Sequence, residues 1–297
     1  MASDPTIKQL KYLCAIAEKQ HFGKAAKSCF VTQSTLSVGI QELEQSLGLP
    51  LVERGRKSAL LTAAGENVVK RASEILAQVR ALKEEAASAT EPLSSRIRLG
   101  AIPTIAPYLL PDTLALIRKH HPRLQLLIRE DLSANLVSLL NQGQLDLILL
   151  ALPYPVEAAY THELFSDPFV LAHPVGHALE KRNVIKPRDL RGHDILLLEQ
   201  GHCLRSHILD SCNLTNSQIS LTFEATSLHT IVPMVANGVG ITLLPKMAVD
   251  KGILKGVSGV ATKAFSAAGV QRGIGLVWRK ASPRVNDYLK LAEYFAR

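Results

Sequence analysis

The sequence has few aromatic residues, few cysteines and no long apolar run. Only 5% of its 297 residues are aromatic, with a single tryptophan, whereas 47% are hydrophobic. Its cores must therefore be built from aliphatic side chains. No stretch approaches the roughly 18 uninterrupted apolar residues of a membrane-spanning helix. The segment from Met1 to Pro5 lacks the basic start and apolar run of a signal peptide. We therefore expect a cytoplasmic protein with no membrane partner.

Length, cysteine content and charge limit the protein class further. A chain of 297 residues exceeds one ordinary core, so we expect two or three domains. In a reducing compartment, four cysteines indicate that any disulfide is transient, catalytic or sensory. The net charge of +8 favours a polyanionic partner, but residues 1–90 hold only 12 Lys and Arg against 9 Asp and Glu. Local motifs must therefore identify any nucleic-acid interface.

The first 61 residues have the pattern of three short helices followed by a hairpin. Apolar residues recur every three or four positions over 6–18, and a second short helix is predicted over 21–29. Thr32 can cap a third helix, which Gly48 can end as a left-handed residue and Pro50 prevents from continuing. Two short apolar stretches then surround a basic turn. We predict a compact winged helical domain over residues 1–61.

The third helix carries side chains suited to reading DNA. Short or amide side chains lie at its start and along one face, and they fit a major groove in which the backbone must approach the bases closely. These predicted contacts are Gln33, Ser34, Ser37 and Gln41. The basic residues of the wing, Arg54, Arg56 and Lys57, can grip the DNA backbone or minor groove. The alternative is a helical protein-interaction domain with a solvated polar face.

Residues 62–90 predict one long helix of about 40 Å. Apolar residues recur along it every three or four positions without a proline: Val68, Ala72, Ile75, Val79, Leu82 and Ala86. The stripe either packs against its own chain or pairs with a second copy. Because the helix lies between domains, we expect it to link the domains and to form a dimer.

Residues 94–297 alternate between strand and helix patterns. Apolar strands are predicted at 97–101, 124–129, 145–150, 169–173, 195–199, 220–224, 241–244 and 274–279, with helical segments between them. We predict two α/β lobes with a cleft between them, the first formed by residues 94–164 and 270–297 and the second by 165–269. The fold class is thus α/β, with an all-α winged N-terminal domain and a linker helix.

Two cysteines lie close together in the sequence, at Cys203 and Cys212. Cys203 lies two residues after Gly201 at a predicted helix start, where the helix dipole and Arg205 favour the nucleophilic thiolate. In a continuous helix the two residues would lie about 13 Å apart along the axis, whereas a disulfide needs Cα atoms within about 7 Å. Joining them therefore requires the segment to unwind.

The other cysteines and the nearby histidines give weaker signals. Cys14 and Cys29 occupy core-facing helix positions, so we interpret them as packing residues. His202, Cys203 and His207 have the wrong spacing for a closed metal site, and no fourth ligand is evident. We therefore expect neither a metal nor a cofactor.

The N-terminal motif resembles that of the LysR-type transcription regulators. The similarity covers the whole chain and is strongest in these segments: Ala25-Ala26, Thr32-Gln33-Ser34, Leu36-Ser37, Ile40, Leu43-Glu44, Leu47-Gly48, Leu51-Val52-Glu53-Arg54 and Leu61-Thr62 with Gly65. The resemblance implies a winged helix-turn-helix, a dimerising linker helix and a two-lobed effector domain like that of periplasmic binding proteins. It also implies double-stranded DNA as a partner, contact with RNA polymerase as an activator, and a homodimer that pairs into a homotetramer.

The segment Gly201-His202-Cys203-Leu204-Arg205 with Cys212, together with Ile102-Pro103-Thr104 and His21-Phe22, resembles the peroxide-sensing branch of that family. The resemblance implies that Cys203 attacks hydrogen peroxide and that Cys212 then forms a disulfide with it, which a glutaredoxin or thioredoxin system reduces. The implied peroxide-binding residues are Thr104, Ser133, His202 and Arg272. Ser133 departs from the usual threonine but keeps the hydroxyl. The resemblance also implies that the protein controls antioxidant genes under oxidative stress.

Three alternatives remain to be weighed against this prediction. A metabolite-responsive regulator of the same family would bind a small anion between the lobes and use neither cysteine. A thiol peroxidase would turn over peroxide with the same nucleophile but leave the N-terminal domain unexplained, so we do not expect an enzyme. A periplasmic binding protein would explain the two lobes. It would explain neither the lack of a signal peptide nor the N-terminal domain, so we reject this alternative.

Overall fold

A computed structural model describes residues 4–54, 59–88, 93–215, 223–266 and 269–296. The chain divides into two compact units, one containing the first 89 residues and the other nearly all of residues 90–297. No helix within the described ranges is both long and apolar enough to cross a membrane.

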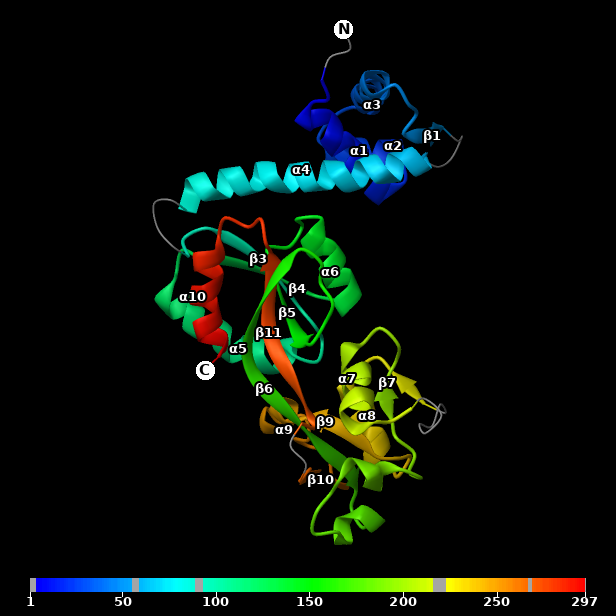
Figure 1. Cartoon of the computed structure of the whole chain (residues 1–297), viewed down its shortest axis with the longest axis vertical. Helices are drawn as coiled ribbons and strands as arrows, with labels where there is room; N and C mark the ends of the chain where they lie inside the picture. Colours follow the sequence, from blue (N-terminus) through cyan, green and yellow to red (C-terminus); the bar gives the residue numbers. More distant parts are fainter. Residues whose placement is uncertain (1–3, 55–58, 89–92, 216–222, 267–268, 297) are drawn as a thin grey trace. The chain divides into compact units, whose positions relative to one another are not determined.

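The N-terminal unit is a three-helix domain with a hairpin and a long final helix (Figure 1). Its elements are α1 (Ile7–Lys19), α2 (Phe22–Ser28), α3 (Gln33–Leu47), β1 (Val52–Arg54), β2 (Ala59–Leu61) and α4 (Ala63–Ser88). Thr32 caps α3 by accepting a hydrogen bond from the Thr35 amide at 3.2 Å, and Gly48 ends the helix with a φ of 72°. The predicted helices, caps and wing strands are therefore confirmed.

Close backbone approaches fix the hairpin against the helices. Glu44 accepts hydrogen bonds from the amides of Leu51 and Val52 at 2.8 and 3.1 Å, which ties β1 to α3. Gly65 lies so near the chain that a Cβ there would be 2.1 Å from the carbonyl oxygen of Leu51. Only glycine fits at this junction between the wing and α4.

The long helix α4 has one buried side and one exposed apolar side. Ala72 and Leu76 are buried in the core of the N-terminal unit, where α4 packs on α1. Ile75 and Leu82 are 40% and 68% exposed. The apolar stripe thus packs partly on its own chain, and its other members are exposed to solvent.

The C-terminal unit is built on a seven-stranded mixed sheet. Its strands are β3 (Arg96–Ala101), β4 (Gln125–Glu130), β5 (Leu147–Leu152), β6 (Ala159–Pro174), β9 (Thr242–Pro245), β10 (Val260–Ala264) and β11 (Gln271–Arg279). The strand order is β10-β6-β11-β5-β3-β4, and β9 also pairs with β6. Strands β3, β4 and β5 are parallel and are connected by α5 (Ala106–His120) and α6 (Ser133–Asn141), which confirms the predicted βαβ units.

Two separate cores divide this unit into lobes. The first lobe is centred on β3, β5 and α10 (Val285–Phe295), and the second on the end of β6 with α7 (Cys203–Cys212), α8 (Leu228–Ala236) and α9 (Lys246–Asp250). A short parallel pair, β7 (Leu197–Leu198) and β8 (Glu224–Ala225), completes the second lobe. Figure 1 shows β6 and β11 running from one lobe into the other.

Several strand predictions had the wrong length. The strand predicted at 169–173 is the apolar end of the 16-residue strand β6, and the strand predicted at 195–199 is reduced to Leu197–Leu198 with an isolated bridge at Ile195. Strand β10 was not predicted. Residues 216–222, which include most of the strand predicted at 220–224, lie outside the described residues.

Candidate redox site and nucleic-acid interface

The outer face of α3 presents the polar side chains that the sequence singled out. Gln33, Ser34 and Gln41 are exposed and Ser37 is half-buried, while the opposite face packs Leu36, Ile40 and Leu43 into the core. The helix N-terminus carries partial positive charge, which favours phosphate. The side chain of Arg54, and all of Arg56 and Lys57, lie outside the described residues.

Cys203 occupies the first position of α7, next to the first lobe. Its side chain is buried among first-lobe residues, although α7 itself belongs to the second lobe. His202 makes no side-chain capping bond to the helix, so its imidazole is free for other contacts. Arg205 donates to the carbonyl of Leu198 at 3.2 Å and pairs with Glu224 at 3.7 Å. The positive charge of Arg205 is therefore partly balanced by the carboxylate of Glu224.

Three segments meet at a narrow crevice in front of Cys203. The crevice is lined by Ile102, Pro103, Thr104, Leu132, Ser133, His202 and Cys203. Its empty space amounts to about 150 Å³, and no water-sized sphere fits in it. The fold thus brings together four of the residues that the sequence indicated.

Arg272 reaches this crevice through Thr104. The guanidinium donates from Nη1 to Thr104 Oγ1 and from Nη2 to the Thr104 carbonyl, both at 2.9 Å. Because Thr104 Oγ1 accepts this bond, its own hydrogen remains free to be donated. Arg272 thereby positions a hydroxyl donor, although it does not itself line the crevice.

A buried carboxylate that sequence reasoning missed holds Arg272 in place. Asp167 lies directly across the sheet from Arg272, and its Oδ2 accepts bonds from Nε at 3.1 Å and Nη2 at 3.0 Å. The other carboxylate oxygen accepts the Met247 amide at 2.9 Å. The sequence shows only an aspartate near the predicted boundary between the lobes. Its pairing with Arg272 depends on the register of β6 and β11, which the sequence does not reveal.

Ser133 and His202 provide the other polar groups of the crevice. Ser133 is 1% exposed, and its hydroxyl has no hydrogen-bond partner among the described residues, so it can both donate to and accept from a ligand. Burial lowers the pKa of His202, although Glu199 opposes the shift. The imidazole is therefore neutral near pH 7 and offers one donor and one acceptor.

Cys212 lies at the far end of α7 in the core of the second lobe. Burial raises the pKa of its thiol to about 11, so it is protonated at neutral pH. All four cysteines are free thiols in this structure. Since α7 is a continuous ten-residue helix, its ends are about 13 Å apart, and a Cys203–Cys212 bond requires the helix to open.

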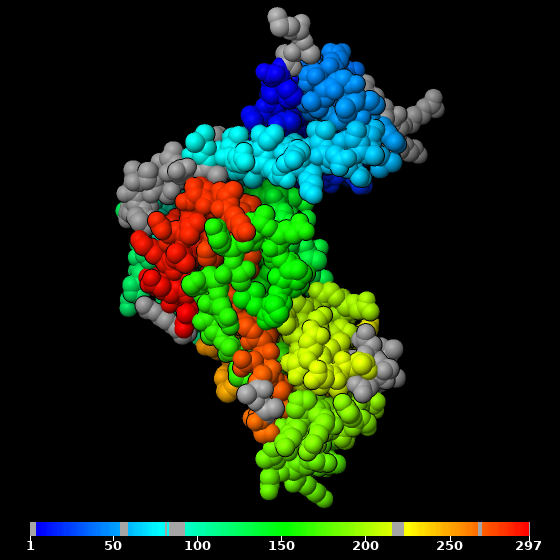
Figure 2. All heavy atoms as spheres, viewed as in Figure 1, coloured from blue at the N-terminus to red at the C-terminus, as the bar shows by residue number. Residues whose placement is uncertain are grey.

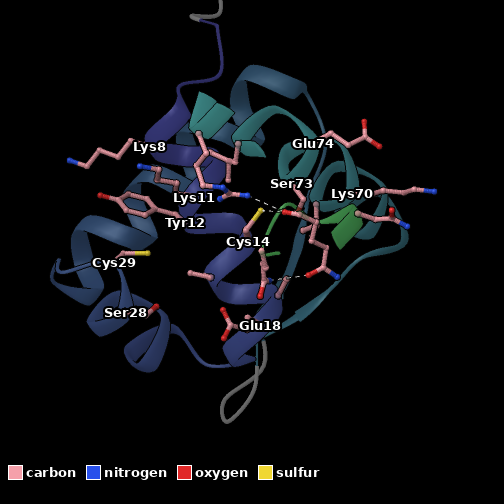
Figure 3. Close-up of a pocket in the computed structure, with 18 of the residues that line it drawn as sticks. Lys8, Lys11, Tyr12, Cys14, Glu18, Ser28, Cys29, Lys70, Ser73 and Glu74 are labelled. Carbon is pink, nitrogen blue, oxygen red and sulfur yellow. Dashed lines mark hydrogen bonds between the residues drawn. The ribbon is translucent and has the colours of Figure 1, made fainter. Parts of the chain in front are cut away.

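The remaining cysteines pack in the N-terminal unit. Cys14 and Cys29 are half-buried against its core, and Figure 3 shows both lining a groove that α1, the end of α2 and α4 form. Burial raises the pKa of Cys14, although a hydrogen bond between its Sγ and Ser73 Oγ, 3.6 Å apart, opposes the shift. Across the described part of the chain, no group of three or more His, Cys, Asp or Glu residues is arranged to hold a metal ion.

A winged helix-turn-helix joined to a two-lobed α/β domain defines a DNA-binding regulator with its own sensor domain. Residues 7–66 match the model of the bacterial regulatory helix-turn-helix proteins of the lysR family, and residues 90–297 match the LysR substrate binding domain. The chain therefore belongs to the LysR family.

Relatives with known names extend this comparison. A probable hydrogen peroxide-inducible genes activator from Streptomyces viridosporus is 41% identical over 97% of this chain and 92% of its own length. Full-length OxyR from Pseudomonas aeruginosa, solved as a cysteine-to-aspartate variant, is 34% identical with a TM-score of 0.80, covering 99% and 98% of the two chains. A cysteine-to-serine variant of Corynebacterium glutamicum OxyR, solved with H2O2 bound, is 32% identical with a TM-score of 0.68, covering 100% and 93%.

Proposed function

We propose that this chain is a transcription regulator that senses hydrogen peroxide by reversibly joining Cys203 to Cys212, and so controls antioxidant genes. The observation that carries the proposal is the crevice, where a buried cysteine at a helix start faces Thr104, Ser133 and His202. The names of the relatives, which include peroxide-inducible activators and an H2O2-bound structure, support the same chemistry.

The first step is attack by the Cys203 thiolate on one peroxide oxygen. The S–O bond forms as the O–O bond breaks, leaving Cys203 as a sulfenic acid, and the departing hydroxide takes up a proton to become water. Thr104 can donate its free hydroxyl hydrogen to peroxide, and Ser133 has an unused donor and acceptor. Arg272 orients Thr104 for this role.

The second step joins the two cysteines. After Cys212 loses its proton, its thiolate attacks the sulfur of the Cys203 sulfenic acid, the S–S bond forms and the S–O bond breaks, and hydroxide leaves as water. Because the cysteines stand at opposite ends of α7 and in different cores, this step opens the helix and disturbs both lobes. A cellular dithiol, such as a thioredoxin or glutaredoxin system, restores both thiols by two exchange reactions.

The DNA-binding assignment follows the polar face of α3. We infer that Gln33, Ser34, Ser37 and Gln41 contact a major groove and that Arg54, Arg56 and Lys57 grip the adjacent backbone. The functional units are residues 1–61 for DNA binding, 62–90 for linkage and dimerisation, and 94–297 for sensing. Exposed Ile75 and Leu82 support pairing of α4 with a second copy, and dimers pair into a tetramer that acts in the cytoplasm with RNA polymerase.

The metabolite-binding alternative gives the crevice residues no role. A ligand held elsewhere between the lobes would leave Cys203 and the polar groups around it, Thr104, Ser133 and His202, unused.

Peptide mapping tests the proposal directly. One equivalent of hydrogen peroxide, added to the reduced full-length protein, should produce a Cys203–Cys212 bridge detected by mass spectrometry under non-reducing conditions. The Cys212→Ser variant should instead accumulate a sulfenic acid on Cys203. If both thiols remain free while methionines or Cys29 become oxidised, the proposal is wrong.

A further inference from the structure

His207 lies on α7 between the two redox cysteines, and the mechanism above does not use it. It is one helical turn beyond Cys203, so its side chain points back toward the turn that begins with Cys203. The residue is only 8% exposed. A buried imidazole at this position needs a partner, and the partner determines what the residue does.

The ring contacts a carbonyl of the first lobe. His207 Nε2 lies 3.1 Å from the carbonyl oxygen of Pro153, in the segment that follows β5. Because a carbonyl oxygen can only accept, Nε2 must carry the hydrogen. Burial lowers the pKa of His207, although the bond to Pro153 opposes the shift, so the ring donates this bond in its neutral form.

The bond joins the helix that must open to the lobe that holds Cys203. In Figure 2, the atoms of α7, coloured yellow, border the green atoms of the first lobe on this face. The segment that accepts the bond also lies beside the peroxidatic residue, since burial and the nearby Cys203 raise the pKa of Tyr154. A single side chain thus fastens the middle of α7 to the wall of the Cys203 site.

We infer that His207 is a positioning residue that holds α7 closed in the reduced state and slows the second step of sensing. The inference rests on the proposed function. Formation of the sulfenic acid needs α7 in place and leaves the His207–Pro153 bond intact. Formation of the disulfide needs α7 to open and must break that bond. His207 therefore sets how fast the sulfenic acid on Cys203 converts to the disulfide.

Two variants separate this role from other effects of the ring. His207→Gln keeps an N–H donor that can reach the Pro153 carbonyl, whereas His207→Leu fills similar space without a donor. Stopped-flow measurements after rapid mixing with peroxide would follow disulfide formation in the full chain. The same substitutions combined with Cys212→Ser would isolate formation of the sulfenic acid.

Loss of one hydrogen bond should speed disulfide formation roughly fivefold in His207→Leu. The Gln variant should stay within about twofold of wild type. Sulfenic acid formation should be equal in all three backgrounds. The inference would be overturned if disulfide formed no faster in His207→Leu than in wild type, or if the Gln variant were as fast as the Leu variant. Either result would leave the proposed function standing. A wild-type chain that never forms the Cys203–Cys212 bridge would instead refute the proposed function, and the inference with it.

Discussion

Replacing Asp167 by Asn removes the charge that balances Arg272 in the interior of the sensor domain. The side chains of Arg272 and Asp167 are 0% and 2% exposed. Removing one partner of a buried ion pair typically costs about 3–5 kcal/mol, because the remaining charge cannot be solvated. Asn keeps the shape and can accept a bond, so we expect Asp167→Asn to lower the free energy of unfolding by about 3 kcal/mol.

The single tryptophan makes this measurement specific to the C-terminal unit. Trp278 lies in β11, on the same strand as Arg272, and is 3% exposed. Its fluorescence during urea unfolding of the full-length protein therefore reports on the C-terminal unit, which contains the pair. Because Arg272 also fixes Thr104, oxidation of Cys203 by peroxide should slow by roughly tenfold or more in the same variant.

A double variant provides the control. Asp167→Asn combined with Arg272→Met removes both charges and keeps the volume, so its stability should return to within about 1 kcal/mol of wild type. Its rate of peroxide oxidation should stay low, since the guanidinium no longer holds the Thr104 hydroxyl. A single Asp167→Asn substitution that costs less than about 1 kcal/mol, or a double variant less stable than the single one, would refute the reasoning.

Three further results are expected. Ser133→Ala should leave stability unchanged or raise it by about 1 kcal/mol, because it removes a buried hydroxyl that has no partner. The same variant should oxidise more slowly at Cys203 in stopped-flow assays with peroxide, and an unchanged rate would contradict the role of the hydroxyl. Gly65→Ala should destabilise the N-terminal unit by about 3 kcal/mol, measured by its thermal unfolding, because a Cβ would meet the Leu51 carbonyl; wild-type stability would contradict this. Since the pKa of Cys212 is raised to about 11, its thiolate fraction and its alkylation rate should rise about tenfold per pH unit from pH 7 to 10; a plateau below pH 9 would count against burial of that thiol.

The N-terminal elements could be predicted because local signals coincide there. Thr32, Gly48 and the apolar spacing of α3 each act within a few residues, and together they mark both ends of the helix. The first half of β6 could not be predicted in the same way. It carries polar residues and is held by pairing with β11 over its whole length, so its strand state depends on a distant partner.

The candidate site shows the same division. Cys203, His202 and Thr104 carry the resemblance to a known family, and the fold places them around one crevice. Asp167 and His207 gave no usable signal because their roles depend on cross-strand register and burial. The hydrogen-bond partners of Arg272 could not be predicted either, since no local pattern reveals that its guanidinium is shared between a carboxylate and Thr104.

The central claim is that joining Cys203 to Cys212 changes how the protein holds DNA. Footprinting on one operator, selected from random duplexes by the reduced protein, tests it most directly. Reduced and peroxide-treated protein should protect different lengths of that operator, because in the proposed mechanism the opening of α7 rearranges the assembled copies. The Cys203→Ser variant should protect the reduced length in both conditions. Identical footprints from reduced protein and from protein shown to contain the bridge would contradict the account.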